Sequence, residues 1–153
     1  MKNQTKEQTQ RKNPGLRRKT ITTALLVICI AFIFHNSLEG AEVSGGRSFQ
    51  LTQAMNGFLA EQIIRKLAHF LEYALEGVLV VSVIWAYELK MRRYACHAAL
   101  FGIMTALTDE TLQLFSDGRA ALVGDVWIDF GGFLFGFLFG VLWLQLRRRI
   151  RGL

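Results

Sequence analysis

Proline and cysteine are both scarce in this sequence, which contains one proline and two cysteines among its 153 residues. The cysteines, Cys29 and Cys96, show no zinc-type spacing, and each falls inside or at the inner edge of an apolar run. These positions argue against both a disulfide and a zinc site, and we interpret the cysteines as small hydrophobic residues. Acidic residues are fewer than basic ones, 12 against 18. Because the basic residues stand at the ends of apolar stretches and form no basic face of a soluble fold, the excess does not predict nucleic-acid binding.

Apolar side chains, by contrast, are abundant, at 52% of the chain. They gather in four runs of 19 to 24 residues, at 20–38, 67–87, 94–115 and 123–146. About 20 residues at 1.5 Å each cross a hydrocarbon core of roughly 30 Å. The sequence therefore predicts an all-α integral membrane protein with four transmembrane helices. The first run also follows a basic stretch, as a signal peptide does, so a cleaved signal is the alternative for that run, although no small-x-small cleavage site follows it.

Lysine and arginine are distributed unevenly around these runs. Seven precede the first run, three lie between the second and third, and four follow the last, so 14 of the 18 fall on one side. Cytoplasmic segments carry the excess of Lys and Arg. We therefore predict a multi-pass protein of the cell membrane whose polar, disordered N-terminal tail (1–19) and basic C-terminal tail (147–153) are cytoplasmic, around a membrane domain at 20–146. Helically spaced apolar residues within 45–66 predict a short amphipathic helix on the outer surface that continues into the second span.

Polar side chains occur inside three of the predicted spans, where a charge costs about 2.5–3.5 kcal/mol on insertion scales. They are His69, Glu72, Tyr73 and Glu76 in the second run, Asp109, Glu110 and Gln113 in the third, and Asp125 and Asp129 in the fourth. By the helical rise, Glu72, Asp109 and Asp129 all lie roughly 7–9 Å below the outer boundary. Three helices thus bring carboxylates to one level, which predicts an acidic pocket open to the outer leaflet.

The fourth run also carries a glycine at every fourth position, Gly132, Gly136 and Gly140. A ridge of small residues lets the backbone of a neighbouring helix approach closely. Since Asp129 precedes this ridge by three residues, we expect its carboxylate to lie near the packed interior of the bundle.

The ordered set of polar residues and glycines resembles the VanZ-like family, named for a protein associated with teicoplanin resistance. The matching residues are His69, Glu72, Tyr73 and Gly77, then Asp109, Glu110 and Gln113, then Gly118, Arg119 and Asp125, and finally Gly132 and Gly136. The resemblance covers residues 67–140. It implies a membrane protein of the bacterial envelope that affects glycopeptide susceptibility, and it supplies no biochemical activity. The chain departs from the family pattern at Glu76, Asp117 and Asp129, where an apolar residue, a proline and an asparagine are usual.

We predict that the pocket binds or modifies an anionic, lipid-linked molecule of the cell envelope, such as an envelope precursor or a glycolipid. The residues expected to act chemically are His69, Glu72, Asp109, Glu110 and Asp125, and those expected to bind the ligand are Tyr73, Gln113, Arg119 and Asp129. Crowded carboxylates can divide the roles of acid and base, and the guanidinium of Arg119 offers a planar fork to a phosphate or carboxylate. No nucleophile motif supports a covalent mechanism.

A hard divalent cation, Mg²⁺ or Mn²⁺, held by His69, Glu72 and Asp109 would offset the repulsion between an acidic pocket and an anionic ligand. The sequence does not by itself require such a cation. Two other interpretations stay open. The protein could be a proton-coupled transporter or a lipid translocase acting as an oligomer, although the inner halves of the runs are almost without polar residues and no inverted repeat is evident. Alternatively, the charged network could only hold the helices together, a role worth about 0.6 kcal/mol per polar pair between membrane helices.

Overall fold

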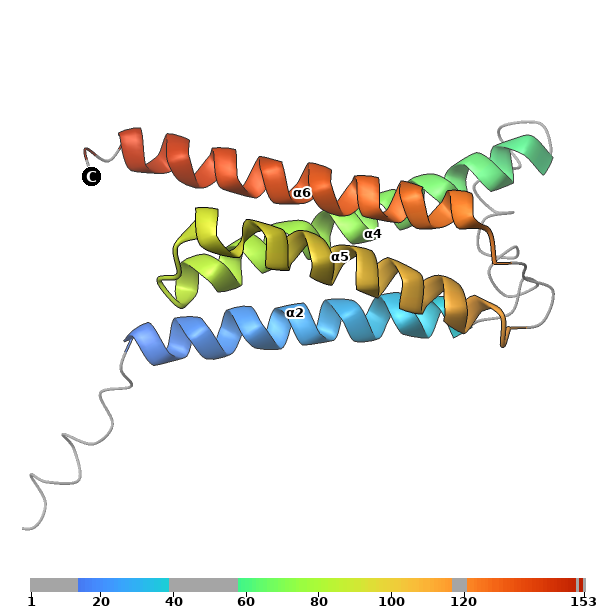
Figure 1. Cartoon of the computed structure of the whole chain (residues 1–153), viewed down its shortest axis with the longest axis horizontal. Coiled ribbons are helices and arrows are strands. Elements are labelled where there is room, and N and C mark those ends of the chain that lie inside the picture. Colours follow the sequence, from blue (N-terminus) through green and yellow to red (C-terminus); the bar gives the residue numbers. More distant parts are fainter. Residues whose placement is uncertain (1–13, 39–57, 117–120, 151, 153) are drawn as a thin grey trace, which may run out of the picture.

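The computed structural model describes residues 14–38, 58–116, 121–150 and 152 of the chain. Within these ranges the fold is all-helical, with four helices and no strand: α2 (Pro14–Leu38), α4 (Phe58–Ala86), α5 (Met91–Gln113) and α6 (Val123–Ile150). The four helices lie side by side along one long axis (Figure 1). The predicted all-α class is confirmed.

Three of these helices, not four, are long and apolar enough to cross a membrane on their own composition: α2, α4 and α6. The prediction of four apolar spans is therefore wrong for its third member, which corresponds to α5. Charged residues stand at both ends of this helix, Arg92 and Arg93 near its start and Asp109 and Glu110 near its end. Because α5 packs beside the other helices, its acidic end is buried inside the bundle. An average hydropathy counts these acidic residues as unfavourable and takes no account of the neighbouring helices that surround them.

Helix boundaries also differ from the predicted ones. The helix α2 begins at Pro14, so the last six residues of the predicted disordered tail are helical; proline suits the first turn of a helix because its missing N–H has no partner there anyway. At the other end α6 continues to Ile150, into the predicted C-terminal tail. The predicted amphipathic segment at 45–66 lies outside the described residues up to position 57, and from Phe58 onward it is part of α4, which continues unbroken into the second span.

The closest helix contact is that between α4 and α6, and glycines make it possible. A Cβ atom at Gly136 would overlap the carbonyl oxygen of Ala74, and one at Gly132 would overlap that of Phe70. From the facing helix, a Cβ at Gly77 would overlap the carbonyl oxygen of Phe133. The predicted glycine ridge on α6 is thus confirmed: Gly132 and Gly136 lie directly against the backbone of α4, and Gly140 lies against the side chain of Val81.

Away from this contact, the surface of the bundle is rich in large apolar side chains. Exposed examples are Val27, Ile28 and Phe32 on α2, Leu67, Leu71 and Leu75 on α4, Leu100, Met104 and Leu107 on α5, and Leu138, Phe139 and Leu142 on α6. Polar groups are instead enclosed between the helices near one end. An apolar exterior around a polar interior is the arrangement that a lipid solvent favours.

The opposite end of the bundle collects basic residues. The start of α2, the turn between α4 and α5 and the end of α6 all lie at this end (Figure 1). Here Arg18 donates to the carbonyl oxygen of Ala86 at 3.1 Å and pairs with Glu88 at 3.3 Å, and its guanidinium lies 4.2 Å from the centre of the Trp85 ring. Both chain ends of the described bundle therefore lie on one side.

Candidate functional site

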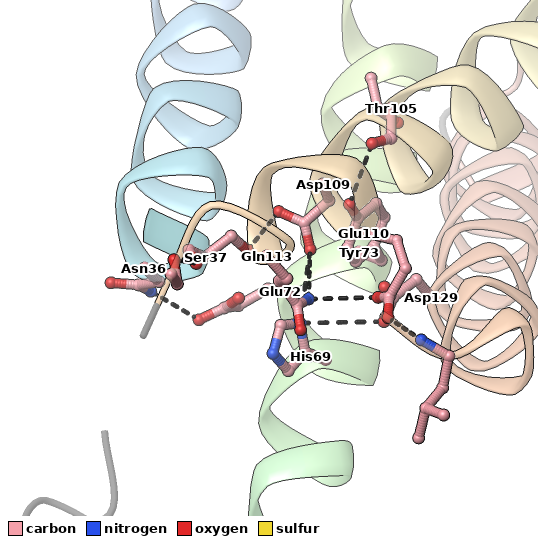
Figure 2. A network of polar contacts seen from close by, with 12 residues as sticks. Asn36, Ser37, His69, Glu72, Tyr73, Thr105, Asp109, Glu110, Gln113 and Asp129 are labelled. Atoms are coloured by element: carbon pink, nitrogen blue, oxygen red, sulfur yellow. Dashed lines mark hydrogen bonds and ion pairs between the residues drawn. The ribbon is translucent and has the colours of Figure 1, made fainter. Parts of the chain in front are cut away.

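Polar side chains from all four helices meet at the end of the bundle opposite to these basic residues (Figure 2). The contributing residues are Asn36 and Ser37 from α2, His69, Glu72, Tyr73 and Glu76 from α4, Asp109, Glu110 and Gln113 from α5, and Asp129 from α6. We call this set the polar cluster. The predicted convergence of the second, third and fourth spans at one level is observed, and α2 joins them.

The link to α2 is made by two hydrogen bonds. The hydroxyl of Ser37 donates to the carboxylate of Asp109, and the amide of Asn36 donates to Glu72 Oε1 at 2.9 Å. The Ser116 hydroxyl, just beyond α5, donates to the carbonyl oxygen of Ser37 at 2.8 Å. Sequence reasoning missed Asn36 and Ser37, although an Asn-Ser pair at the end of an apolar run was a signal that could have drawn attention to them.

On α5, Gln113 bridges the two neighbouring carboxylates. Its Nε2 lies 3.2 Å from Glu110 Oε2 and 3.4 Å from Asp109 Oδ2. The other oxygen of Glu110 accepts the backbone N–H of Leu122, which precedes α6 by one residue. Glu110 therefore fastens the end of α5 to the start of α6, and its role is at least partly to fix the position of that segment.

His69 lies between the carboxylates of α5 and α6. Its Nδ1 is 3.8 Å from Asp109 Oδ2 and 3.9 Å from Asp129 Oδ1. One ligand atom from each of these three residues lies within 4.8 Å of the others. The sequence predicted a metal set of His69, Glu72 and Asp109; the structure brings Asp129 into the third place, whereas Glu72 faces Asn36.

Two carboxylates of the polar cluster are buried without a hydrogen bond. Glu76 is 0% exposed and Asp129 is 1% exposed. Neither oxygen of Asp129 accepts a hydrogen bond from the described residues. The Thr105 hydroxyl lies beside Glu76 but donates to the carbonyl oxygen of Gly102 at 3.0 Å, so the Glu76 carboxylate keeps at most a weak contact with it. Beside them, the Tyr73 hydroxyl donates to the carbonyl oxygen of Thr105 at 3.3 Å and is fully buried. A network built only to join helices would satisfy such groups, because a buried carboxylate without a partner is costly.

Two predicted site residues do not belong to the described cluster. Asp125 lies at the start of α6, where it pairs with Lys66 at 3.0 Å, and its side chain is partly exposed. Asp125 therefore lies at the rim of the polar cluster and not inside it. Arg119 falls in the segment 117–120, outside the described residues, and its role stays a prediction.

The three helices that are apolar enough to cross a membrane, together with a polar cluster enclosed between them, define a helical membrane protein. The sequence model of the VanZ/LLP1 family matches residues 21–144, which is most of the chain, and the protein belongs to that family. The match is wider than the predicted resemblance over 67–140 and includes most of the helix α2. No curated protein and no solved structure matches the chain.

Proposed function

We propose that all four helices cross the bacterial cell membrane, with both termini in the cytoplasm and the polar cluster near the outer face. The fourth crossing is α5, whose outward side carries the exposed residues Leu100, Met104 and Leu107. The buried polar side chains of α5, which make its average composition less apolar, point toward the other three helices and not toward the lipid. The start of α2, the turn between α4 and α5 and the end of α6 lie at one end of the bundle, and the sequence there is rich in Lys and Arg. This supports the orientation, since cytoplasmic segments carry the excess of these residues.

We propose further that the polar cluster binds, and acts on, the head group of an anionic lipid-linked molecule of the cell envelope, and that the protein thereby affects teicoplanin susceptibility. The observation that carries this proposal is the buried carboxylate of Asp129, whose oxygens accept no hydrogen bond from the described residues. Such groups are expected where a ligand or an exchanged proton supplies the missing partner.

The arrangement also provides complementary chemical groups. Crowded carboxylates can hold one proton between them and exchange it, and His69 is the side chain best suited to move that proton. The carboxylates of Glu72 and Asp109 already accept hydrogen bonds from Asn36 and Ser37, and a head group that carries hydroxyls could use the same oxygens. Arg119, predicted to stand in the outer loop, would hold the phosphate or carboxylate of the ligand.

Passage of a solute through a single chain is less well supported. Toward the basic end of the bundle the buried residues are apolar and closely packed: Val81, Ile84, Ala98, Phe133 and Phe137. No chain of buried polar groups continues the cluster in that direction among the residues that the structure describes. We therefore assign the cluster to one leaflet.

The proposal is tested by the lipids that accompany the protein. Wild-type protein extracted in mild detergent should carry one anionic lipid-linked species enriched over its share of the membrane extract, as measured by mass spectrometry. The Asp109→Asn variant, at equal protein amount, should lose that enrichment, whereas Glu88→Gln at the opposite end should retain it. A wild-type lipid profile equal to that of the bulk membrane would exclude stable head-group binding.

A further inference from the structure

Three potential ligands meet at the centre of the polar cluster, one from each of three helices. They are the Nδ1 atom of His69 on α4 and one carboxylate oxygen each from Asp109 on α5 and Asp129 on α6. Asp109 and Asp129 are almost fully buried, and the His69 side chain is only 15% exposed. Because each residue comes from a different helix, the spacing of these atoms is set by the packing of the bundle and not by one helical turn.

The surroundings of Asp129 indicate that its carboxylate lacks a compensating positive charge or proton. Its side chain is buried, and neither oxygen accepts a hydrogen bond from the described residues. Among the described residues, the basic atom that pairs with it is His69 Nδ1, at 3.9 Å, which is too long for a hydrogen bond. Lys66, the next basic residue along α4, is engaged with Asp125 at the rim. A buried carboxylate in an apolar surround requires a compensating positive charge or a proton.

The distances fit a bound cation. Ligand atoms held about 2.1 Å from one octahedral cation lie roughly 3.0 Å apart when adjacent and about 4.2 Å apart when opposite. The separations of 3.8 and 3.9 Å from His69 Nδ1 to the two carboxylates lie between these two values, so a cation would need only a small inward movement of the three side chains. One imidazole nitrogen with two carboxylate oxygens is a donor set that suits first-row divalent cations, whereas Ca²⁺ prefers oxygen ligands alone.

We infer that His69, Asp109 and Asp129 bind one divalent first-row transition-metal ion, such as Mn²⁺, between α4, α5 and α6. Two positive charges offset the two carboxylates, and the remaining coordination positions are open to water or to a ligand oxygen. A cation at this place also removes the repulsion between the cluster and an anionic head group. That last step rests on the proposed function, whereas cation binding itself does not.

Hydrogen bonds around the three residues support this assignment. The carboxylate of Asp109 receives the Ser37 hydroxyl and the Gln113 amide, which hold it in one orientation, as the outer partners of metal-binding carboxylates do. The alternative is a proton retained on Asp129. In that case the side chain needs no cation, and the cluster should not bind one.

The test uses the full chain in detergent, without added lipid, after metal has been removed with a chelator. Mn²⁺ is titrated and its free signal is followed by electron paramagnetic resonance, and pulsed spectra are recorded for ¹⁴N coupling to the bound ion. We expect one Mn²⁺ per chain with one coupled nitrogen. The coupling should vanish in His69→Gln, and affinity should fall at least tenfold in Asp129→Asn, while Glu88→Gln should bind as the wild type does.

Size-exclusion profiles and helix content measured by circular dichroism will show whether each variant is folded. If Asp129→Asn does not fold, the nitrogen coupling in the wild type and its loss in His69→Gln still decide the question. Failure of the wild type to bind Mn²⁺ stoichiometrically, or binding without nitrogen coupling, would overturn the inference. Because no lipid is present, this result is independent of whether head-group binding is found.

Discussion

The two ends of the bundle are held together by different interactions. At the end that holds the polar cluster, hydrogen bonds from Asn36 to Glu72 and from Ser37 to Asp109 join α2 to α4 and to α5. In the remainder, glycine-mediated backbone contacts between α4 and α6 and a core that includes Phe137 supply close packing without polar groups. In a membrane, association of helices depends mainly on such packing, and polar pairs add only about 0.6 kcal/mol each on average. Packing therefore contributes more to the association of the helices than the polar end does, and we propose that the polar end serves another purpose.

The largest expected effect comes from disturbing the packed region. Gly136→Leu places side-chain atoms where the carbonyl oxygen of Ala74 lies, so α4 and α6 cannot approach. We expect a loss of about 3 kcal/mol or more, which would be seen as little folded protein in membranes and a lower thermal midpoint in detergent. Gly131→Leu is the matched control, because a Cβ at Gly131 meets no atom within 4 Å. Equal stability of the two variants would show that the glycine contact does not support the bundle.

The second prediction is that substitutions of Arg119 impair function and leave the fold intact. If the residue only balances nearby acids, lysine should replace it, since both side chains carry one positive charge. If it holds a phosphate or carboxylate through two parallel hydrogen bonds, lysine should not, because an ammonium lacks the planar fork. We expect Arg119→Lys to lose most of the teicoplanin phenotype at normal membrane abundance, with Arg119→Ala little worse. Full activity of the lysine variant would show that charge balance is enough.

A smaller effect is expected when one hydrogen bond of the polar end is removed. Ser37→Ala deletes the donor to Asp109 and should lower the free energy of unfolding by about 0.5–1.5 kcal/mol. Ser82→Ala is the control, because the hydroxyl of Ser82 donates to Val78 O of its own helix at 2.9 Å and joins no other helix. Thermal unfolding in detergent measures both. A loss as large as that of Gly136→Leu would mean that the polar end does hold the fold.

The smallest effect on the protein is expected from single cysteines that report topology. In a background without Cys29 and Cys96, cysteines at Ser44 and Asp117 should react with an impermeant thiol reagent added to intact cells, and one at Arg92 should not. Arg92 is exposed, and a substitution at an exposed position usually changes stability by no more than about 0.5 kcal/mol. The reverse labelling pattern would place the polar cluster at the cytoplasmic face and overturn the proposed orientation.

Much of the fold follows from the sequence because three of the four helices, α2, α4 and α6, carry a long apolar run. The common level of Glu72, Asp109 and Asp129 follows from the helical rise. The glycine ridge was equally predictable, since a period of four keeps its members on one face of α6. These features depend on spacing within single helices, which the sequence contains directly.

Other features depend on how helices pack and could not be predicted in the same way. The contribution of Asn36 and Ser37 requires knowing that α2 lies beside α4 and α5. Likewise, whether Asp125 faces the cluster or the rim depends on the rotation of α6, and the structure places it against Lys66. The prediction of an apolar span at α5 was wrong for a related reason. Asp109, Glu110 and Gln113 of this helix are buried against neighbouring helices, and a helix with such neighbours can carry polar residues that an isolated span cannot.

The central claim is that the polar cluster serves function and not stability, and Asp109→Asn tests it most directly. The amide keeps the shape of the side chain and can still accept the hydrogen bond from Ser37, but it carries no charge. Thermal midpoint, membrane abundance and teicoplanin susceptibility should be measured on the same preparations, with Glu88→Gln as the charge-matched control. We predict near-normal abundance and midpoint with loss of the phenotype. A wild-type phenotype at normal abundance, or a phenotype that falls only in proportion to lost protein, would contradict the claim.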